Sequence, residues 1–277
     1  MSETRRDQSS HERIDNSEIQ HRRVVIENSH GEKLVGVLQD TGSTETVVIC
    51  HGLQSSKDRI PMVTIANFFE RAMISSFRFD FAGNGESQGS FQYGNYRREV
   101  EDLRSVLQHL RGDNRDISAI IGHSKGGNVV LLYAAKYKDV QTVVNISGRF
   151  FLERGIEARL GMFAYRVTEE SLMDRLTTDT LEACLLIHEN CRVLTVHGSN
   201  DRIVHVTEAS EFAKNIKNHK LCLIEEADHE YTSHQHQLAS IVLSFFKLDP
   251  KNDDESGDIS TSNQDSMRSV VPISSRM

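Results

Sequence analysis

The chain has 277 residues, a formal net charge of −8 and a pI near 5.9. Its 40 acidic residues outnumber its 32 Lys and Arg, which excludes nucleic-acid binding through a basic face, because phosphate contacts need clustered cations. No window is apolar enough to span a bilayer, and residues 1–20 contain no apolar segment of the kind found in signal peptides. We therefore expect a cytoplasmic protein that acts on a small molecule, with neither a nucleic-acid partner nor a membrane span. The sequence does not indicate an oligomeric state.

Strand-like and helical segments alternate along most of the chain after a polar leader at residues 1–20. The strand-like segments cover residues 22–28, 33–39, 46–51, 74–81, 117–123, 141–147, 192–198 and 220–227, and the helical ones cover residues 62–72, 96–111, 126–137, 206–216 and 237–248. Near-continuous apolar strands separated by helices predict an α/β fold with a mostly parallel central sheet covered on both faces. The first two strands have no helix between them, so we expect them to form an antiparallel hairpin at one edge.

The alternation breaks between residues 149 and 190, where the sequence favours helix and contains no strand-like segment. This stretch lies where a strand-to-helix connection is expected, and we interpret it as a short helical cap inserted after the sixth strand. After residue 248 the chain is rich in Asp, Ser and Asn and nearly free of aromatics, which predicts a disordered tail over residues 249–277. The sequence thus predicts one domain over residues 21–248.

The four cysteines, Cys50, Cys184, Cys191 and Cys222, form no C-x-x-C pair. Two of them, Cys50 and Cys222, lie inside apolar strand-like segments. The pattern indicates reduced, buried thiols in an intracellular protein.

The segment IGHSKGG at residues 121–127 places a serine between two glycines where a buried strand is expected to turn into a helix. This G-x-S-x-G pattern is typical of a nucleophile elbow, in which strained backbone angles at the serine leave no room for side chains two residues before and after it. Gly122 and Gly126 occupy these two positions around Ser124. The amides at the start of the following helix would favour negative charge at the serine. Taken alone, the pentapeptide fits a serine N-cap with a glycine turn equally well.

A nucleophilic serine needs a base and an acid that orients the base, and in folds with this elbow they follow in the order Ser, Asp or Glu, His. Asp201 comes directly after the strand-like segment 192–198, and His229 comes directly after the segment 220–227. Taken singly, Asp201 fits a turn residue equally well, and His229 fits a surface histidine equally well. Together with the elbow and the order, they predict a Ser124–His229–Asp201 catalytic triad.

An oxyanion hole needs two backbone N–H groups, one from the residue after the nucleophile and one from the loop after the third strand. Lys125 supplies the first, and Leu53, which follows His51 and Gly52, supplies the second. The glycine allows the backbone to approach a substrate closely. The role of the Lys125 side chain stays open.

Five motifs, HGL, DFAGNGES, GHSKGG, HGSND and DH, occur in this order and resemble those of the α/β-hydrolase superfamily. The short predicted cap resembles the serine aminopeptidase-like and cinnamoyl- or feruloyl-esterase-like branches of that superfamily. The resemblance extends over about residues 22–248. It implies the roles of nucleophile, acid and base for the three triad residues named above, and those of oxyanion donors for Leu53 and Lys125. Many relatives have an apolar residue where this chain has Lys125.

These observations predict a serine hydrolase that cleaves a carboxylic ester of a small molecule through an acyl-enzyme, without a cofactor or a metal. Thioester or amide cleavage and acyl transfer are variants of the same chemistry. A hydrolase-fold receptor with slow or absent turnover is an alternative from a different class. The loop at Gly83 lacks the G-x-G-x-x-G spacing of a dinucleotide site, and the histidines after His229 lack the spacing of a zinc site.

The last three residues, Ser275, Arg276 and Met277, resemble the Ser-Lys-Leu address of peroxisomal proteins. Such an address is read from an accessible chain end, which a disordered tail would present. The sequence therefore offers the peroxisome as an alternative to the cytoplasm.

Overall fold

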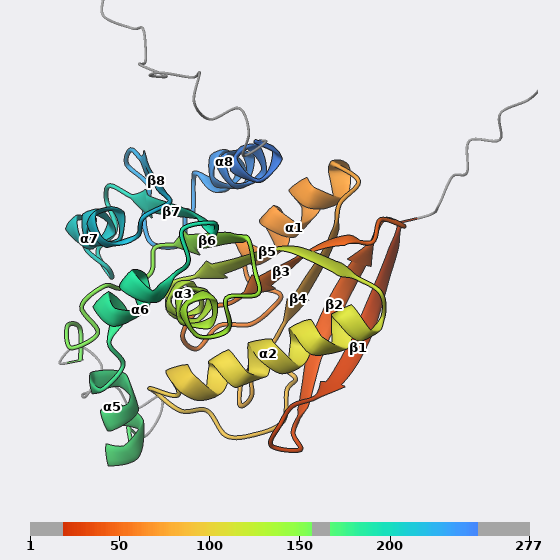
Figure 1. Ribbon diagram of the computed structural model, residues 1–277, viewed down its shortest axis with the longest axis horizontal. Coiled ribbons are helices and arrows are strands. Elements are labelled where there is room, and N and C mark those ends of the chain that lie inside the picture. Colours follow the sequence, from red (N-terminus) through yellow and green to blue (C-terminus); the bar gives the residue numbers. More distant parts are fainter. Residues whose placement is uncertain (1–18, 157–166, 249–277) are drawn as a thin grey trace, which may run out of the picture. The chain divides into compact units, whose positions relative to one another are not determined.

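A computed structural model describes residues 19–156 and 167–248 of the chain. Its strands form one sheet in the order β1-β2-β4-β3-β5-β6-β7-β8 (Figure 1). The strands are β1 (Gln20–Glu27), β2 (Lys33–Asp40), β3 (Glu45–Cys50), β4 (Ser75–Phe79), β5 (Asp116–His123), β6 (Thr142–Ile146), β7 (Arg192–Gly198) and β8 (His219–Ile224). The helices are α1 (Met62–Arg71), α2 (Tyr96–Gly112), α3 (Lys125–Tyr137), α5 (Glu169–Leu176), α6 (Thr180–Leu186), α7 (Thr207–Asn215) and α8 (Gln235–Lys247).

The sheet is parallel from β4 to β8, and β2 pairs antiparallel with both β1 and β4. The tight turn between β1 and β2 is closed by a hydrogen bond from the Gly31 N–H to the Asn28 carbonyl, 3.0 Å long. Both the predicted mostly parallel α/β sheet and the predicted hairpin edge are therefore confirmed.

Helices cover both faces of the sheet (Figure 1). On one face, apolar side chains of α2, α3, α6 and α7 join a buried cluster that includes Leu103, Val129 and Phe212. On the other face, α1 and α8 contribute Phe69 and Val242 to a second cluster. Because helices cover both faces, every residue of β6 and β7 is buried, and so is every residue of β3 except the first.

The carboxyl ends of the parallel strands meet at one edge of the sheet, and the residues singled out by the sequence follow those ends. Leu53 comes after β3, Ser124 after β5, Asp201 after β7 and His229 after β8. Ligand sites of open α/β sheets lie at this edge. The topology thus gathers residues that are far apart along the chain.

The described part of the segment 149–190 contains the short helices α5 and α6 and no strand, in agreement with its predicted helical character. α6 buries Ala183 and Cys184 in the core that covers one face of the sheet. Residues 157–166 of the predicted cap lie outside the described residues. So do the predicted tail, with Ser275, Arg276 and Met277, and the predicted leader except for its last two residues, of which Gln20 begins β1.

All four cysteines carry free thiols. Cys50, Cys184 and Cys191 are buried as predicted, whereas Cys222 is only half-buried because β8 is the last strand of the sheet. Burial raises the pKa of the Cys184 and Cys191 thiols to about 12. No helix within the described part of the chain has the length and apolar character needed to cross a membrane.

Candidate active site

Ser124 lies between β5 and α3 with φ 54° and ψ −118°, a conformation that side chains disfavour. The neighbours hold this strained residue in place. A Cβ atom on Gly122 would lie 2.1 Å from the Gly126 carbonyl oxygen, and one on Gly126 would lie 2.5 Å from the His51 carbonyl oxygen. The Ser124 N–H donates to the carbonyl of Ile146 in β6 over 2.7 Å. The two glycines therefore give the chain the space it needs to make this turn.

Ser124, His229 and Asp201 form a continuous hydrogen-bonded chain. The Ser124 Oγ lies 2.9 Å from the His229 Nε2, and the His229 Nδ1 lies 2.7 Å from the Asp201 Oδ2. An ionised carboxylate can only accept hydrogen bonds, so the His229 Nδ1 carries the ring proton and its N–H donates a hydrogen bond to Asp201. The unprotonated Nε2 then accepts the hydroxyl proton of Ser124. The structure thus brings together the three residues that the sequence selected.

The Asp201 carboxylate is held from both of its oxygens. Its Oδ1 accepts the N–H groups of Ile203 and Val204, each over 2.8 Å, and its Oδ2 also lies 3.3 Å from the His197 Nε2. Burial favours the protonated carboxyl, but the hydrogen bonds from His197 and His229 outweigh it and hold the pKa of Asp201 well below its usual range. Asp201 is therefore charged at neutral pH.

The neighbouring Asp228 has a different role. Its Oδ1 accepts the N–H of Thr232 over 2.8 Å, and its Oδ2 accepts the Thr232 hydroxyl over 2.7 Å. These bonds stabilise the turn after His229. Asp201, and not Asp228, contacts the imidazole.

His123, inside the elbow motif, anchors the loop that carries His229, a contact that sequence reasoning missed. Its Nε2 donates to the His229 carbonyl over 2.8 Å. Burial, with a smaller contribution from His229, lowers the pKa of His123 to about 3, so its ring is neutral. The hydroxyl of Tyr231 donates to the Val196 carbonyl over 3.1 Å and ties the same loop to β7.

The segment after β3 passes directly against the serine. A Cβ atom on Gly52 would lie 3.0 Å from the Ser124 Cβ, so the residue must be small to allow this approach. Leu53 and Lys125 line the same cavity as Ser124. The two residues predicted to donate backbone N–H groups therefore border the space beside the serine hydroxyl.

The loop after β4 braces this segment. The Phe81 N–H donates to the His51 Nε2 over 3.1 Å. The buried Lys57 ammonium contacts Asp80 at 2.9 Å and Glu86 at 2.6 Å, and these partners raise the pKa of Lys57 although burial opposes them. The glycine-containing motif DFAGNGES thus supports the backbone next to Ser124.

The Lys125 side chain, which the sequence left without a role, forms a buried ion pair. Its Nζ lies 2.6 Å from the Glu99 Oε1, and the two side chains are 4% and 5% exposed. The ammonium also lies 5.1 Å from the centre of the Tyr96 ring. Burial raises the pKa of Glu99 to about 7, against the attraction of Lys125. No sequence signal could identify this pair, because the tertiary packing of α2 against α3 creates it.

A cavity of about 540 Å³ opens beside Ser124 and His229. Its other described walls include polar and charged side chains: Tyr93, Tyr96, Lys125, Asn128, Arg149, Arg175, Arg202 and Glu230. The sequence did not single out Arg149 or Arg175, because the segment 149–190 contains no recognisable motif. A larger cavity of about 1020 Å³ between α2, α3, α5 and α6 contains none of the hydrogen-bonded chain, so we place the site in the smaller one.

One group of possible metal ligands occurs in the described part of the chain. His123, His229 and Glu230 each offer a ligand atom, and these atoms lie within 4.8 Å of one another. Both nitrogens of His229 already serve Ser124 and Asp201, and the Nε2 of His123 serves a carbonyl. A metal ion here would have to compete with the hydrogen bonds that build the site.

An eight-stranded sheet of this order, with a serine on a strained strand-to-helix turn, defines an α/β hydrolase. The chain belongs to the serine aminopeptidase S33 family, whose family model matches residues 42–182.

Among proteins of known sequence, a monoacylglycerol lipase of Mycolicibacterium smegmatis is 31% identical over 111 residues, which is 39% of each chain. Among solved structures, Est1E of Butyrivibrio proteoclasticus, with ferulic acid bound, superimposes with a TM-score of 0.72 at 22% identity and covers 80% of this chain and 97% of its own. The Pyrococcus furiosus esterase Pf2001 gives a TM-score of 0.70 at 22% identity over 88% and 96% of the two chains. The two structures show the same fold.

Proposed function

We propose that this protein is a serine hydrolase that cleaves a carboxylic ester of a small molecule through an acyl-enzyme intermediate. The observation that carries the proposal is the hydrogen-bonded chain from Ser124 through His229 to Asp201, with the serine on a strained turn beside a cavity. This arrangement can deprotonate a hydroxyl at neutral pH and hold the proton until the leaving group needs it.

In the first half-reaction the Ser124 Oγ attacks the ester carbonyl carbon while its proton moves to the His229 Nε2. The tetrahedral oxyanion accepts the backbone N–H groups of Leu53 and Lys125. Collapse breaks the bond to the alkoxy oxygen, which leaves as an alcohol with the proton from His229. Asp201 keeps the imidazole in the correct tautomer and stabilises its positive charge.

In the second half-reaction a water molecule attacks the acyl-serine, and His229 takes its proton. Collapse of the second tetrahedral intermediate releases the carboxylic acid and returns the proton to the Ser124 Oγ. Besides the substrate and this water, the proposed steps use only groups of Ser124, His229 and Asp201 and the backbone N–H groups of Leu53 and Lys125.

The comparisons support an ester as the substrate class. Proteins of this fold include Est1E, which was solved with ferulic acid bound, and the esterase Pf2001. The relative from Mycolicibacterium smegmatis is a monoacylglycerol lipase. The family takes its name from serine aminopeptidases, which cleave amides by the same chemistry. Thioester or amide cleavage and acyl transfer are variants that a substrate panel separates.

The test is labelling by a fluorophosphonate together with steady-state hydrolysis of p-nitrophenyl acetate. We expect stoichiometric labelling that peptide mass spectrometry locates on Ser124, and continued turnover after the first equivalent of p-nitrophenol. Ser105→Ala, a half-buried serine in α2 outside the cavity, is the control and should label and turn over like the wild type. Label on another serine, with Ser124 unmodified, would refute the assignment, and a single burst without turnover would favour a receptor.

A further inference from the structure

The lining of the cavity beside Ser124 carries an excess of positive charge. Lys125, Arg149, Arg175 and Arg202 line it, whereas Glu230 is the only acidic residue among the described lining residues. An acyl chain of hydrocarbon alone would gain little from such a wall, because apolar groups bind best to apolar surroundings. A substrate group that carries a negative charge would match these cations better than a plain alkyl chain.

Two of these four cations are already neutralised from outside the cavity. Lys125 pairs with Glu99 at 2.6 Å, and the Arg149 Nη1 lies 3.4 Å from the Glu208 Oε1. Within residues 19–156 and 167–248, no carboxylate pairs with the guanidinium of Arg175 or Arg202. Arg202 is exposed, so water can solvate its charge.

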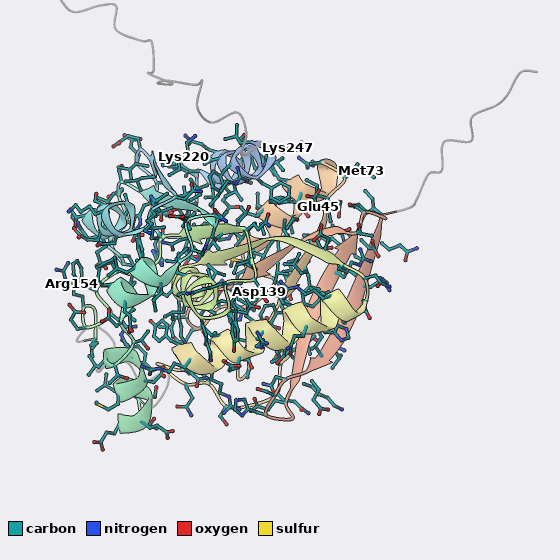
Figure 2. All side chains as sticks on the ribbon, in the orientation of Figure 1. Glu45, Met73, Asp139, Arg154, Lys220 and Lys247 are labelled. Carbon is teal, nitrogen blue, oxygen red and sulfur yellow. The ribbon has the colours of Figure 1, made fainter. Side chains whose placement is uncertain are left out.

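Arg175 is different, because it is 5% exposed and, among the described residues, donates only to neutral acceptors. Its Nε donates to the Leu152 carbonyl over 2.8 Å, its Nη1 to the Tyr96 hydroxyl over 3.0 Å, and its Nη2 to the Arg154 carbonyl over 3.0 Å. Figure 2 labels Arg154 on the segment between β6 and α5 that receives this bond. A guanidinium has five N–H groups, so two of them have no acceptor among the described residues after these three bonds.

A buried cation without a counterion is costly, because burial removes its hydration and neutral acceptors replace only part of it. The face of the Tyr93 ring, 5.0 Å from the Arg175 guanidinium, also replaces part of it. The nearby Arg149 experiences the uncompensated charge. Burial lowers the pKa of Arg149, Glu208 opposes this, and the Arg175 guanidinium lowers it further.

Tyr96 links this charge to the reacting end of the cavity. Its hydroxyl accepts from Arg175, and its ring lies 5.1 Å from the ammonium of Lys125, the residue next to Ser124. One aromatic side chain thus separates the two ends. A single buried cation without a carboxylate partner matches a monoanion such as a carboxylate better than a phosphate monoester, whose charge at neutral pH is between about −1.5 and −2.

We propose that the substrate is a small ester that carries a carboxylate, which binds Arg175 while the ester carbonyl lies at Ser124. This inference rests on the proposed hydrolase function and adds the substrate class. Arg175 is a specificity residue in this proposal, because it contacts the substrate without touching the reacting atoms.

The test compares esters that differ by one charge. In the first pair, mono-p-nitrophenyl adipate and p-nitrophenyl hexanoate both have acyl chains of six carbons, and the adipate carries a carboxylate on the acyl side. In the second pair, 4-carboxyphenyl hexanoate and phenyl hexanoate, the carboxylate is on the alcohol side. We expect wild-type kcat/KM to be at least about tenfold higher for the charged member of one pair, after subtraction of spontaneous hydrolysis. The pair that shows the preference identifies the half of the substrate that carries the carboxylate.

Arg175→Gln should lower this charged-to-neutral ratio by about 10- to 100-fold, the usual effect of losing a charged hydrogen bond. Arg97→Gln is the matched control, because Arg97 also connects α2 to α5, through Asp174 at 3.0 Å, but lies outside this cavity. It should leave the ratio unchanged. An equal loss of both esters in Arg175→Gln would assign Arg175 a structural role only and overturn the proposal.

Two measurements keep the inference testable if Arg175→Gln does not fold or if the chain does not hydrolyse esters. The wild-type ratio needs no variant, and a preference for the neutral member of both pairs would refute the carboxylate. Calorimetry on Ser124→Ala, which does not depend on turnover, compares monomethyl adipate with methyl hexanoate. Binding of the adipate at least about tenfold tighter supports the anion site even without hydrolysis, and equal binding overturns it.

Discussion

The two ends of the cavity are built in different ways. At one end, Ser124, His229 and Asp201 each follow a neighbouring or nearby parallel strand, and dense backbone hydrogen bonds hold their loops. At the other end, Arg149 and Arg175 belong to the connection between β6 and β7, and side chains that cross between α2, α5 and α7 hold them.

The difference separates the proposed chemistry from the proposed selectivity. The sheet places the reacting groups with a precision that hydrogen-bonded strand ends can supply, and any protein with this topology can reproduce it. The connection between β6 and β7 adds no strand to the sheet, so the wall that meets the rest of the substrate can vary while the strand ends stay the same.

Loss of the nucleophile should have the largest effect, and it tests the strand-end half of the comparison. Ser124→Ala should lower kcat for p-nitrophenyl acetate by a factor on the order of 10⁶, because no other side chain on the elbow can form the acyl-enzyme. Steady-state kinetics measure this loss of kcat, and protein blocked by a fluorophosphonate gives the baseline. Activity within tenfold of the wild type would remove Ser124 from the mechanism.

Neutralising the acid should cost about 10⁴-fold in kcat, since Asp201→Asn offers the His229 ring an amide in place of the carboxylate that fixes its tautomer. Asp228→Asn is the control on the same loop as His229. It should change kcat by much less, because the Asp228 carboxylate bonds to Thr232 and not to the His229 ring within the described part of the chain. The opposite ranking of the two variants would move the acid to Asp228.

Breaking the buried pair below the cavity should change stability rather than chemistry. Lys125→Met leaves Glu99 buried without a cation and should lower the free energy of unfolding by about 3 kcal/mol. Lys136→Met on the same helix loses an exposed pair with Glu101 and should cost less than about 1 kcal/mol. Urea unfolding followed by circular dichroism measures both. Equal losses would show that the Lys125–Glu99 pair is replaceable.

The loss of stability in Lys125→Met should depend on pH. The pKa of Glu99 is raised from 4.5 to about 7 in the folded protein, so the folded state favours the protonated carboxyl and stability from this group falls as pH rises through that interval. Without Lys125 burial raises the pKa further, and the loss in Lys125→Met should be larger at pH 8 than at pH 5. Adding Glu99→Gln should abolish this difference, and a loss independent of pH would contradict the argument.

The smallest effect should come from the surface contact between α2 and α5. Arg97 is 58% exposed, and Arg97→Gln should lower the free energy of unfolding by no more than about 1 kcal/mol. In urea unfolding, we expect the variant to have the same free energy of unfolding at about 0.1 and 0.5 M salt. The wild type should lose its small advantage over the variant at the higher salt, because salt screens the exposed ion pair. A loss of several kcal/mol would mean that the exposed pair, and not the buried Arg175, attaches α5.

The sequence by itself determined the alternation of strands and helices, the hairpin edge and the positions of Ser124, Asp201 and His229 on loops after particular strands. These features are local. Apolar periodicity defines an element, and a glycine on each side of the serine relieves a steric clash two residues away. Strand direction follows from which segments have helices between them. The prediction that Cys222 is buried was wrong. Cys222 is only half-buried because β8 is the last strand of the sheet, and no local pattern shows this position.

Only the tertiary structure decided the contacts that join elements across the fold. Glu99 lies on α2 and meets Lys125 on α3, His123 reaches the carbonyl of His229, and Arg175 of α5 reaches Tyr96 of α2. In the sequence, a lysine, a glutamate or an arginine of a helix is indistinguishable from the many that face solvent. Whether such a charge is paired, buried or left facing a cavity depends on how the helices pack on the sheet, and this packing determines the positive wall beside Ser124.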